Sequence, residues 1–256
     1  MNIERYDDEI WDEYRWEEHI NDIERKSLEL TNFFNQTWGN TSPSWVRLLD
    51  EYQNQNDVID AYIEEAIINE EAYFPDDDDW DDEDEDEPDN ELFMESSEEE
   101  EYNSTLPEKI DSLFEEVIHY TGEFRIEDME FVEDIYAYNL AREFGLKILA
   151  LAESYKELSA EHFFDVLVNT SLQMSAKLAI GFNLGFDHEV IGGNIIYSKK
   201  ALDNANSALA LLCSLKSRNL LLQADYFELH QLLTNVRNEI GMYIQDLRES
   251  INLSNY

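Results

Sequence analysis

The chain has 256 residues, of which 43% are hydrophobic and 12% aromatic, a composition that can bury a core and that excludes wholesale disorder. Its formal net charge of -43 excludes a surface that follows nucleic-acid phosphates or an anionic membrane over most of the molecule, because both need Lys and Arg. A basic protein partner, bound cations or solubility alone are the remaining reasons for such a charge.

The start of the chain and its single cysteine bear on the compartment. The first residues contain no basic stretch followed by an apolar one, so no signal peptide is expected. No apolar run approaches the roughly 20 residues that cross a bilayer. Cys213 has no cysteine to pair with, and it lies in the apolar run 209–215, where we expect a small buried core residue. We therefore expect a soluble, cytoplasmic protein.

Residues 1–75 are acidic and rich in aromatic side chains. Residues 1–107 carry a net charge of -32, against -11 for residues 108–256, and they hold all five tryptophans. Apolar residues at helical spacing predict one helix to about residue 36 and a second from Trp45 to Ile67, joined by a turn at 38–44. We expect an acidic helical hairpin with an aromatic face over residues 1–75.

Residues 76–106 form a low-complexity segment rich in Asp and Glu. Eighteen of the 26 residues 76–101 are acidic and none is basic, so self-repulsion predicts a disordered linker. Trp80 and the run Leu92-Phe93-Met94 are apolar groups within it. Alternation of acidic and large apolar residues is typical of a segment that becomes ordered on a partner, and a purely solubilising linker is the alternative.

Residues 107–256 show the periodicity of long helices. Thr105-Leu-Pro-Glu108 resembles a capping box and predicts a helix start, and four longer periodic stretches follow at about 127–157, 160–184, 190–217 and 224–251. No long run alternates with a period of two. The fold class is therefore all-α, with a C-terminal up-and-down four-helix bundle preceded by the hairpin and the linker. The last stretch has an apolar seam at spacings of three and four, formed by Leu233, Val236, Ile240, Ile244, Leu247 and Ile251.

Part of this region resembles a known family. Residues 173–185 run Gln-Met-Ser-Ala-Lys-Leu-Ala-Ile-Gly-Phe-Asn-Leu-Gly. Gln173, Ala176, Asn183 and Gly185 follow the family's pattern of a glutamine before an alanine-rich helix that ends in an Asn-Ile-Ala-Glu-Gly type motif, although the Glu-Gly ending is absent. About residues 130–251 thus resemble the four-helix-bundle family encoded in intervening sequences of 23S ribosomal RNA genes, which includes the accessory protein of diversity-generating retroelements.

The resemblance implies a compact bundle that forms a homo-oligomer and has no enzymatic activity. Members that accompany retroelements present basic surfaces to nucleic acid. Residues 131–256 here have a net charge of -5 and no dense basic patch, so direct nucleic-acid binding is not carried over.

A search for chemistry yields no catalytic residue, metal site or cofactor site. A di-iron bundle needs two Glu-x-x-His pairs, and only Glu116-Val-Ile-His119 is present. No Gly-rich phosphate loop occurs, and the pair Gly192-Gly193 is interpreted as a turn. The other histidines show no ligand spacing, namely His19, His162, His188 and His230.

We therefore predict a non-catalytic interaction or scaffold protein whose acidic N-terminal half binds a basic protein partner and whose bundle self-associates. A metal-binding or enzymatic bundle, and a nucleic-acid accessory protein acting through the C-terminal bundle, are the alternatives. If the hairpin packs on the bundle, its aromatic residues belong to the core and not to an interface. Tryptophans are the expected anchors, since charges at a rim contribute little affinity. The predicted partner-binding residues are Trp11, Trp16, Trp45, Asp76, Asp77, Asp78, Asp79 and Trp80.

Overall fold

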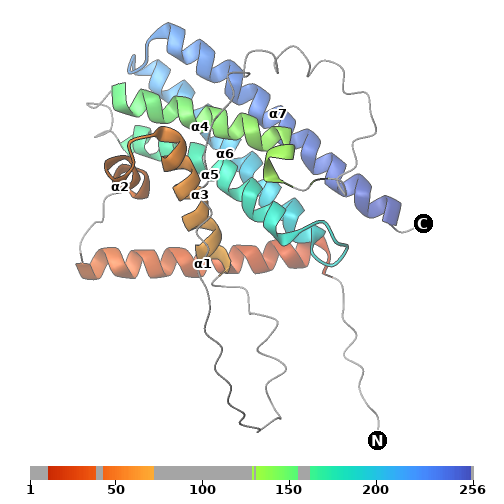
Figure 1. Ribbon diagram of the computed structural model, residues 1–256. Coiled ribbons are helices and arrows are strands. Elements are labelled where there is room, and N and C mark those ends of the chain that lie inside the picture. Colours follow the sequence, from red (N-terminus) through yellow and green to blue (C-terminus); the bar gives the residue numbers. More distant parts are fainter. Residues whose placement is uncertain (1–10, 39–42, 72–128, 130, 155–161, 255–256) are drawn as a thin grey trace, which may run out of the picture. The chain divides into compact units, whose positions relative to one another are not determined.

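The computed structural model describes residues 11–38, 43–71, 129, 131–154 and 162–254. All regular secondary structure in these ranges is helical, which confirms the all-α prediction for this part of the chain. Figure 1 shows the arrangement of the helices. In chain order the elements are α1 (Glu13–Trp38), α2 (Ser44–Glu51), α3 (Gln55–Glu71), the 3-10 turn η4 (Val132–Asp134), α4 (Tyr136–Ser154), α5 (His162–Leu184), α6 (Ile191–Ser217) and α7 (Gln223–Ser254).

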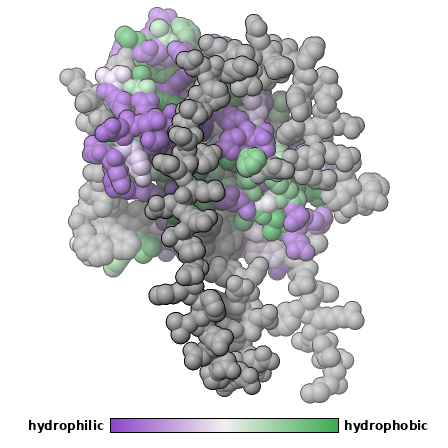
Figure 2. Space-filling view, viewed as in Figure 1, coloured by the Kyte–Doolittle hydropathy of each residue, from purple (hydrophilic) through white to green (hydrophobic). Residues whose placement is uncertain are grey.

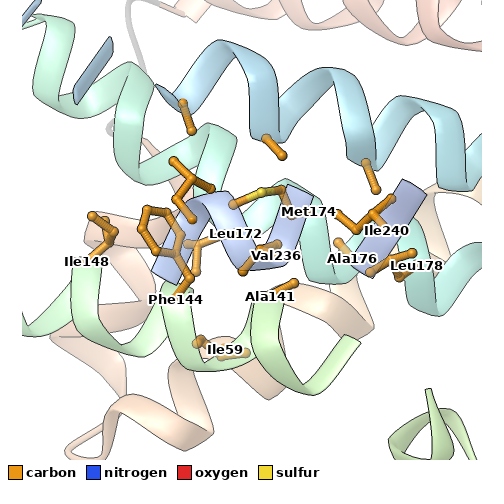
Figure 3. Close-up of a cluster of buried hydrophobic side chains, with 14 of the residues drawn as sticks. Ile59, Ala141, Phe144, Ile148, Leu172, Met174, Ala176, Leu178, Val236 and Ile240 are labelled. Atoms are coloured by element: carbon orange, nitrogen blue, oxygen red, sulfur yellow. The ribbon is translucent and has the colours of Figure 1, made fainter. Parts of the chain in front are cut away.

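The four C-terminal helices enclose the main hydrophobic core. Helix α4 packs on α5, α5 on α6 and α6 on α7, and α7 returns to pack on α4 (Figure 1). Phe144, Leu172 and Ile240 are fully shielded from solvent between them, and each such side chain contributes roughly 1.5–3 kcal/mol through burial. Figure 3 shows that Ile59, from α3, joins the same core. The core therefore includes residues from the N-terminal helices as well as from the four C-terminal ones.

The predicted apolar seam of α7 is confirmed. Its members lie on one face because positions three and four apart are neighbours on a helix. Five of them are at most 5% exposed and the last is half-buried, packed against the core. They are Leu233, Val236, Ile240, Ile244, Leu247 and Ile251.

Short connections join α5 to α6 and α6 to α7, and each of these pairs of helices packs together. At the end of α6, Asn219 adopts a φ of 56°, and the backbone N–H of Leu220 donates to the carbonyl of Leu215 at 3.1 Å. The N–H of Asn219 donates to the carbonyl of Lys216 at 3.0 Å, which completes a Schellman motif. Gly185 ends α5 with a φ of 98°, a conformation that residues with a Cβ rarely adopt.

The N-terminal helices pack on the C-terminal ones. Helix α1 contacts chiefly α6, while α3 contacts α5, α2 and α4. The expected hairpin of the two N-terminal segments is therefore not confirmed. Residues 1–74 and 126–256 belong to one compact unit, so the described helices of both expected domains share it. The other unit, residues 75–125, contains the whole predicted linker and the expected helix start at Thr105, and it lies outside the described residues.

Three local predictions were wrong. The expected second helix is two helices, because Tyr52 is extended (φ -106°, ψ 142°) and the side chain of Asn54 accepts the backbone N–H of Asn56 at 3.1 Å. Cys213 is exposed, since the helix turns about 100° per residue and places its neighbours Leu212 and Leu215 in the core instead. The pair Gly192-Gly193 is not a turn but part of the first turn of α6.

Candidate functional site

The tryptophans predicted as partner anchors are largely part of the core. Trp16 is 8% exposed and Trp45 is 2% exposed, whereas Trp11 is half-buried. The indole N–H of Trp45 donates to Asp165 Oδ1 on α5 at 2.8 Å. The predicted residues Asp76 to Asp79 and Trp80 lie outside the described part of the chain. Of the three predicted anchor tryptophans that lie in the described ranges, only Trp11 is substantially exposed.

Trp16 packs against the backbone of α6. It forms a second, smaller hydrophobic cluster with residues that include Ile20 and Tyr197. A Cβ added at Gly192 would lie 2.5 Å from Trp16 Cδ1, and one added at Gly193 would lie 3.0 Å from Trp16 Cε3. The two glycines are required here because any larger side chain would displace the indole. This contact fixes the N-terminal half of α1 on α6.

A buried ion pair joins α3 and α1 to α5. Lys177, whose side chain is 9% exposed, places its Nζ 2.6 Å from Glu70 Oε1 and 3.1 Å from Glu24 Oε1. The Tyr197 hydroxyl donates to the second oxygen of Glu70 at 3.1 Å. Lys200 binds Glu24 at 2.6 Å. The two carboxylates compensate the charge of the Lys177 ammonium, since an unpaired charge on so buried a side chain is costly.

A separate hydrogen-bond chain joins α3 to α5 near this ion pair. The side-chain amide of Gln173 donates to the Tyr62 hydroxyl at 2.8 Å, and that hydroxyl donates to Asn169 Oδ1 at 2.8 Å. Burial raises the pKa of Tyr62 to about 12, and burial together with the Glu70 carboxylate raises the pKa of Tyr197 still further. Both phenols are therefore protonated donors at neutral pH, and neither is a general base. A cavity of about 400 Å³ adjoins these groups.

A second ionic contact holds the first turn of α1. Arg248 donates from Nε and Nη2 to the two carboxylate oxygens of Glu13 at 2.9 and 2.8 Å, and Lys199 Nζ lies 2.8 Å from Glu13 Oε2. The hydrogen bond from Arg248, together with Lys199, lowers the pKa of Glu13 to about 2 against the opposing effect of burial. Both cations thus stabilise the ionised carboxylate.

The Glu13 contact predicts a pH dependence. Because the pKa of Glu13 lies below its ordinary value of 4.5, the stability that the carboxylate contributes is complete above about pH 4.5 and is lost as the pH falls to about 2. The difference in free energy of unfolding between the wild-type protein and Glu13→Gln should therefore shrink through this window in urea titrations. Glu18→Gln, an exposed control on the same helix, should show no such trend. Identical behaviour of both variants would exclude Glu13 as the group that holds α1.

Together these contacts neutralise much of the basic charge of the C-terminal helices. Residues 131–256 contain ten Lys and Arg residues. Five of them bind carboxylates of α1 and α3, the fifth through a bidentate contact of Arg142 with Asp60 at 2.8 and 3.0 Å. The acidic N-terminal helices thus bind a basic surface of their own chain. The sequence analysis missed this network, although Lys177 is a lone cation in an apolar helical run, a pattern that indicates a paired charge.

Five other carboxylates of the N-terminal helices are exposed, and none of the five makes an ion pair with another residue in the described ranges. Asp22, Glu29, Glu51 and Glu65 also reach solvent, but they pair with Arg25, Lys26 or Arg47 of the N-terminal helices. Figure 2 shows hydrophilic side chains over much of the described surface in its view. The five exposed carboxylates without an ion pair are here called the acidic outer surface. They are Glu17, Glu18, Asp50, Asp57 and Glu64.

Among the described residues, no three His, Cys, Asp or Glu side chains gather closely enough to hold a metal ion. Helices long and apolar enough to span a bilayer are likewise absent from the part of the chain that the structure describes. The histidine of the Glu116–His119 pair lies outside it, and His19 packs edge-on against Trp11 at 5.2 Å between ring centroids.

Comparison of the chain with protein-family models, with curated proteins and with solved structures finds no match. The resemblance of residues 130–251 to the intervening-sequence family therefore stays a prediction.

Proposed function

We propose that this protein is a non-catalytic interaction protein whose acidic outer surface binds a basic protein partner. The observation that carries the proposal is the division of carboxylates on α1–α3. Inward ones, such as Glu13, Glu24 and Glu70, neutralise cations of the C-terminal helices, whereas the five carboxylates of the acidic outer surface have no counter-charge among the described residues. Carboxylates without a counter-charge attract a cationic partner over several ångströms and raise the rate of association with it.

The C-terminal helices act as the scaffold in this proposal. Their contacts support an up-and-down four-helix bundle of α4 to α7, because consecutive helices pack together and α7 closes on α4. A bundle of the family that this region resembles would also self-associate. The alternative of nucleic-acid binding through these helices loses support, since Lys177, Lys199, Lys200 and Arg248 are already paired with carboxylates.

The test neutralises the acidic outer surface without removing any helix, because α2 and α3 contribute to the core and a truncated chain would lose them. Captures from native lysate at low and high salt would compare the wild-type chain with two variants of equal net charge. The wild type and the control should retain the same basic partner at low salt, and the surface variant should retain on the order of tenfold less. The surface variant is Glu17→Gln, Glu18→Gln, Asp57→Asn and Glu64→Gln, and the control is Glu133→Gln, Glu189→Gln, Asp203→Asn and Glu249→Gln, all at exposed positions.

Two outcomes would contradict the proposal. A partner retained equally by all three proteins would place the binding site elsewhere on the chain. A partner retained equally at low and high salt would show that charge does not drive the association, since screening weakens exposed electrostatic contacts.

A further inference from the structure

A groove lies between α3 and the start of α4. It has a volume of about 250 Å³ and is lined mainly by apolar and aromatic side chains. Ile63 and Tyr138 are buried at 7% and 4% exposure, whereas Ile68 is 57% exposed. An isoleucine that exposed, beside a buried apolar floor, leaves apolar area that a partner side chain would cover. The lining residues of this α3–α4 groove are Asp60, Ile63, Glu64, Ile67, Ile68 and Tyr138.

The groove follows one face of α3. Its five α3 residues have the spacing i, i+3, i+4, i+7 and i+8, from Asp60 to Ile68, and therefore form one continuous face. Ile63 belongs to the hydrophobic core and Ile67 packs against it, so these two side chains form the floor. Ile68 extends the apolar face beyond the core to a position that is 57% exposed.

The border of the groove is acidic and already binds a guanidinium. Arg142 donates from Nη2 to both oxygens of Asp60, at 2.8 and 3.0 Å. Glu64 is exposed and makes no ion pair with a described residue. None of the lining residues is basic. Glu64 is therefore the carboxylate of the border that remains uncompensated, and it favours a cationic partner over an anionic one.

Charge selects among the occupants that an apolar groove could take. The acidic segment 76–101 of the same chain contains no basic residue, so Glu64 would repel it. A second copy that presented the same face of α3 would bring like charges together. A segment with Lys or Arg beside a large apolar side chain would cover the apolar floor and place a positive charge next to the acidic border.

We propose that the α3–α4 groove receives a large apolar side chain from an amphipathic segment of the basic partner, with Lys or Arg next to it on the acidic border. This inference rests on the proposed function and names the place where such a partner is anchored. The acidic charge speeds the encounter with the partner, and the apolar side chain provides most of the binding energy. Charges at the rim of an interface contribute little affinity, whereas a desolvated anchor contributes most of it.

The experiment compares two synthetic peptides with the same number of lysines. One is an oligolysine, and the other carries leucines at helical spacing between the lysines. Fluorescence anisotropy would give the Kd of each for the full-length wild-type chain, for Ile68→Ser and for Leu222→Ser. Leu222, in the connection between α6 and α7, is 63% exposed and provides the matched control.

The leucine peptide is expected to bind the wild type and Leu222→Ser roughly tenfold more tightly than the oligolysine, and Ile68→Ser should lose that preference while still binding the oligolysine. Circular dichroism melts should be alike for all three proteins, because both substituted side chains are exposed. A leucine preference that survives in Ile68→Ser would overturn the groove and leave the acidic outer surface as the binding site. If neither peptide binds at low salt, the proposed function itself is wrong.

Discussion

Replacing Trp45 with alanine is expected to lower the free energy of unfolding by about 3–5 kcal/mol. Its indole is 2% exposed and belongs to the main core. Truncation removes this apolar contact and leaves a cavity that the surrounding helices fill only partly. Truncation also removes the donor that the indole N–H provides to Asp165 at 2.8 Å. Urea or guanidinium denaturation of the full-length chain, followed by far-ultraviolet circular dichroism, measures the effect.

Two variants separate the causes of this loss. Trp45→Phe keeps most of the ring but not the N–H, and it should cost about 1 kcal/mol for the hydrogen bond to Asp165, plus the smaller ring volume. Tyr14→Ala changes an aromatic side chain of α1 that is 81% exposed and should stay within about 0.5 kcal/mol of the wild type. An unchanged stability of Trp45→Ala, with reduced capture of a partner, would return Trp45 to the anchor role predicted from the sequence.

The tryptophans show what the sequence determines and what it leaves open. The helical spacing of Ile20 and Ile23 is confirmed, because both side chains are buried on one face of α1, but that periodicity did not assign Trp16 to the same face. It does not say which surface covers that face. The covering surface includes Gly192 and Gly193, about 175 positions away along the chain, whose missing Cβ atoms admit the indole. Periodicity is a local property, and this complementarity of shape is visible only after folding.

The charges show the same limit. The sequence predicts that the acidic N-terminal half binds a basic surface, and composition alone made the C-terminal helices an improbable candidate because their net charge is also negative. Pairing depends on position and not on net charge. Lys200 meets Glu24 because α1 packs on α6, and Lys177 meets Glu70 because α3 packs on α5. The long helices were predictable because their apolar seams are strong, whereas the break near Asn54 depends on one side-chain hydrogen bond.

Replacing Lys177 with methionine is expected to cost about 3–5 kcal/mol of the free energy of unfolding, because Glu70, whose side chain is 13% exposed, would lose the cation beside it. Methionine preserves most of the aliphatic stem, so the loss reports the charge and not the packing. Chemical denaturation at neutral pH measures it. Lys147→Met serves as the control, since its partner Glu228 has a side chain that is 64% exposed and such pairs contribute at most about 1 kcal/mol.

The double variant Lys177→Met with Glu70→Gln tests the cause directly. It removes both charges, while the introduced amide retains an oxygen that accepts the Tyr197 hydroxyl, and Glu24 keeps its contact with Lys200. We expect it to be more stable than Lys177→Met alone, because an uncompensated buried carboxylate costs more than a missing ion pair. Equal stability of the single and double variants would mean that water in the adjoining cavity solvates Glu70. In that case the packing of Trp16 against the glycines of α6, and not the ion pairs, would hold the N-terminal helices on the C-terminal ones.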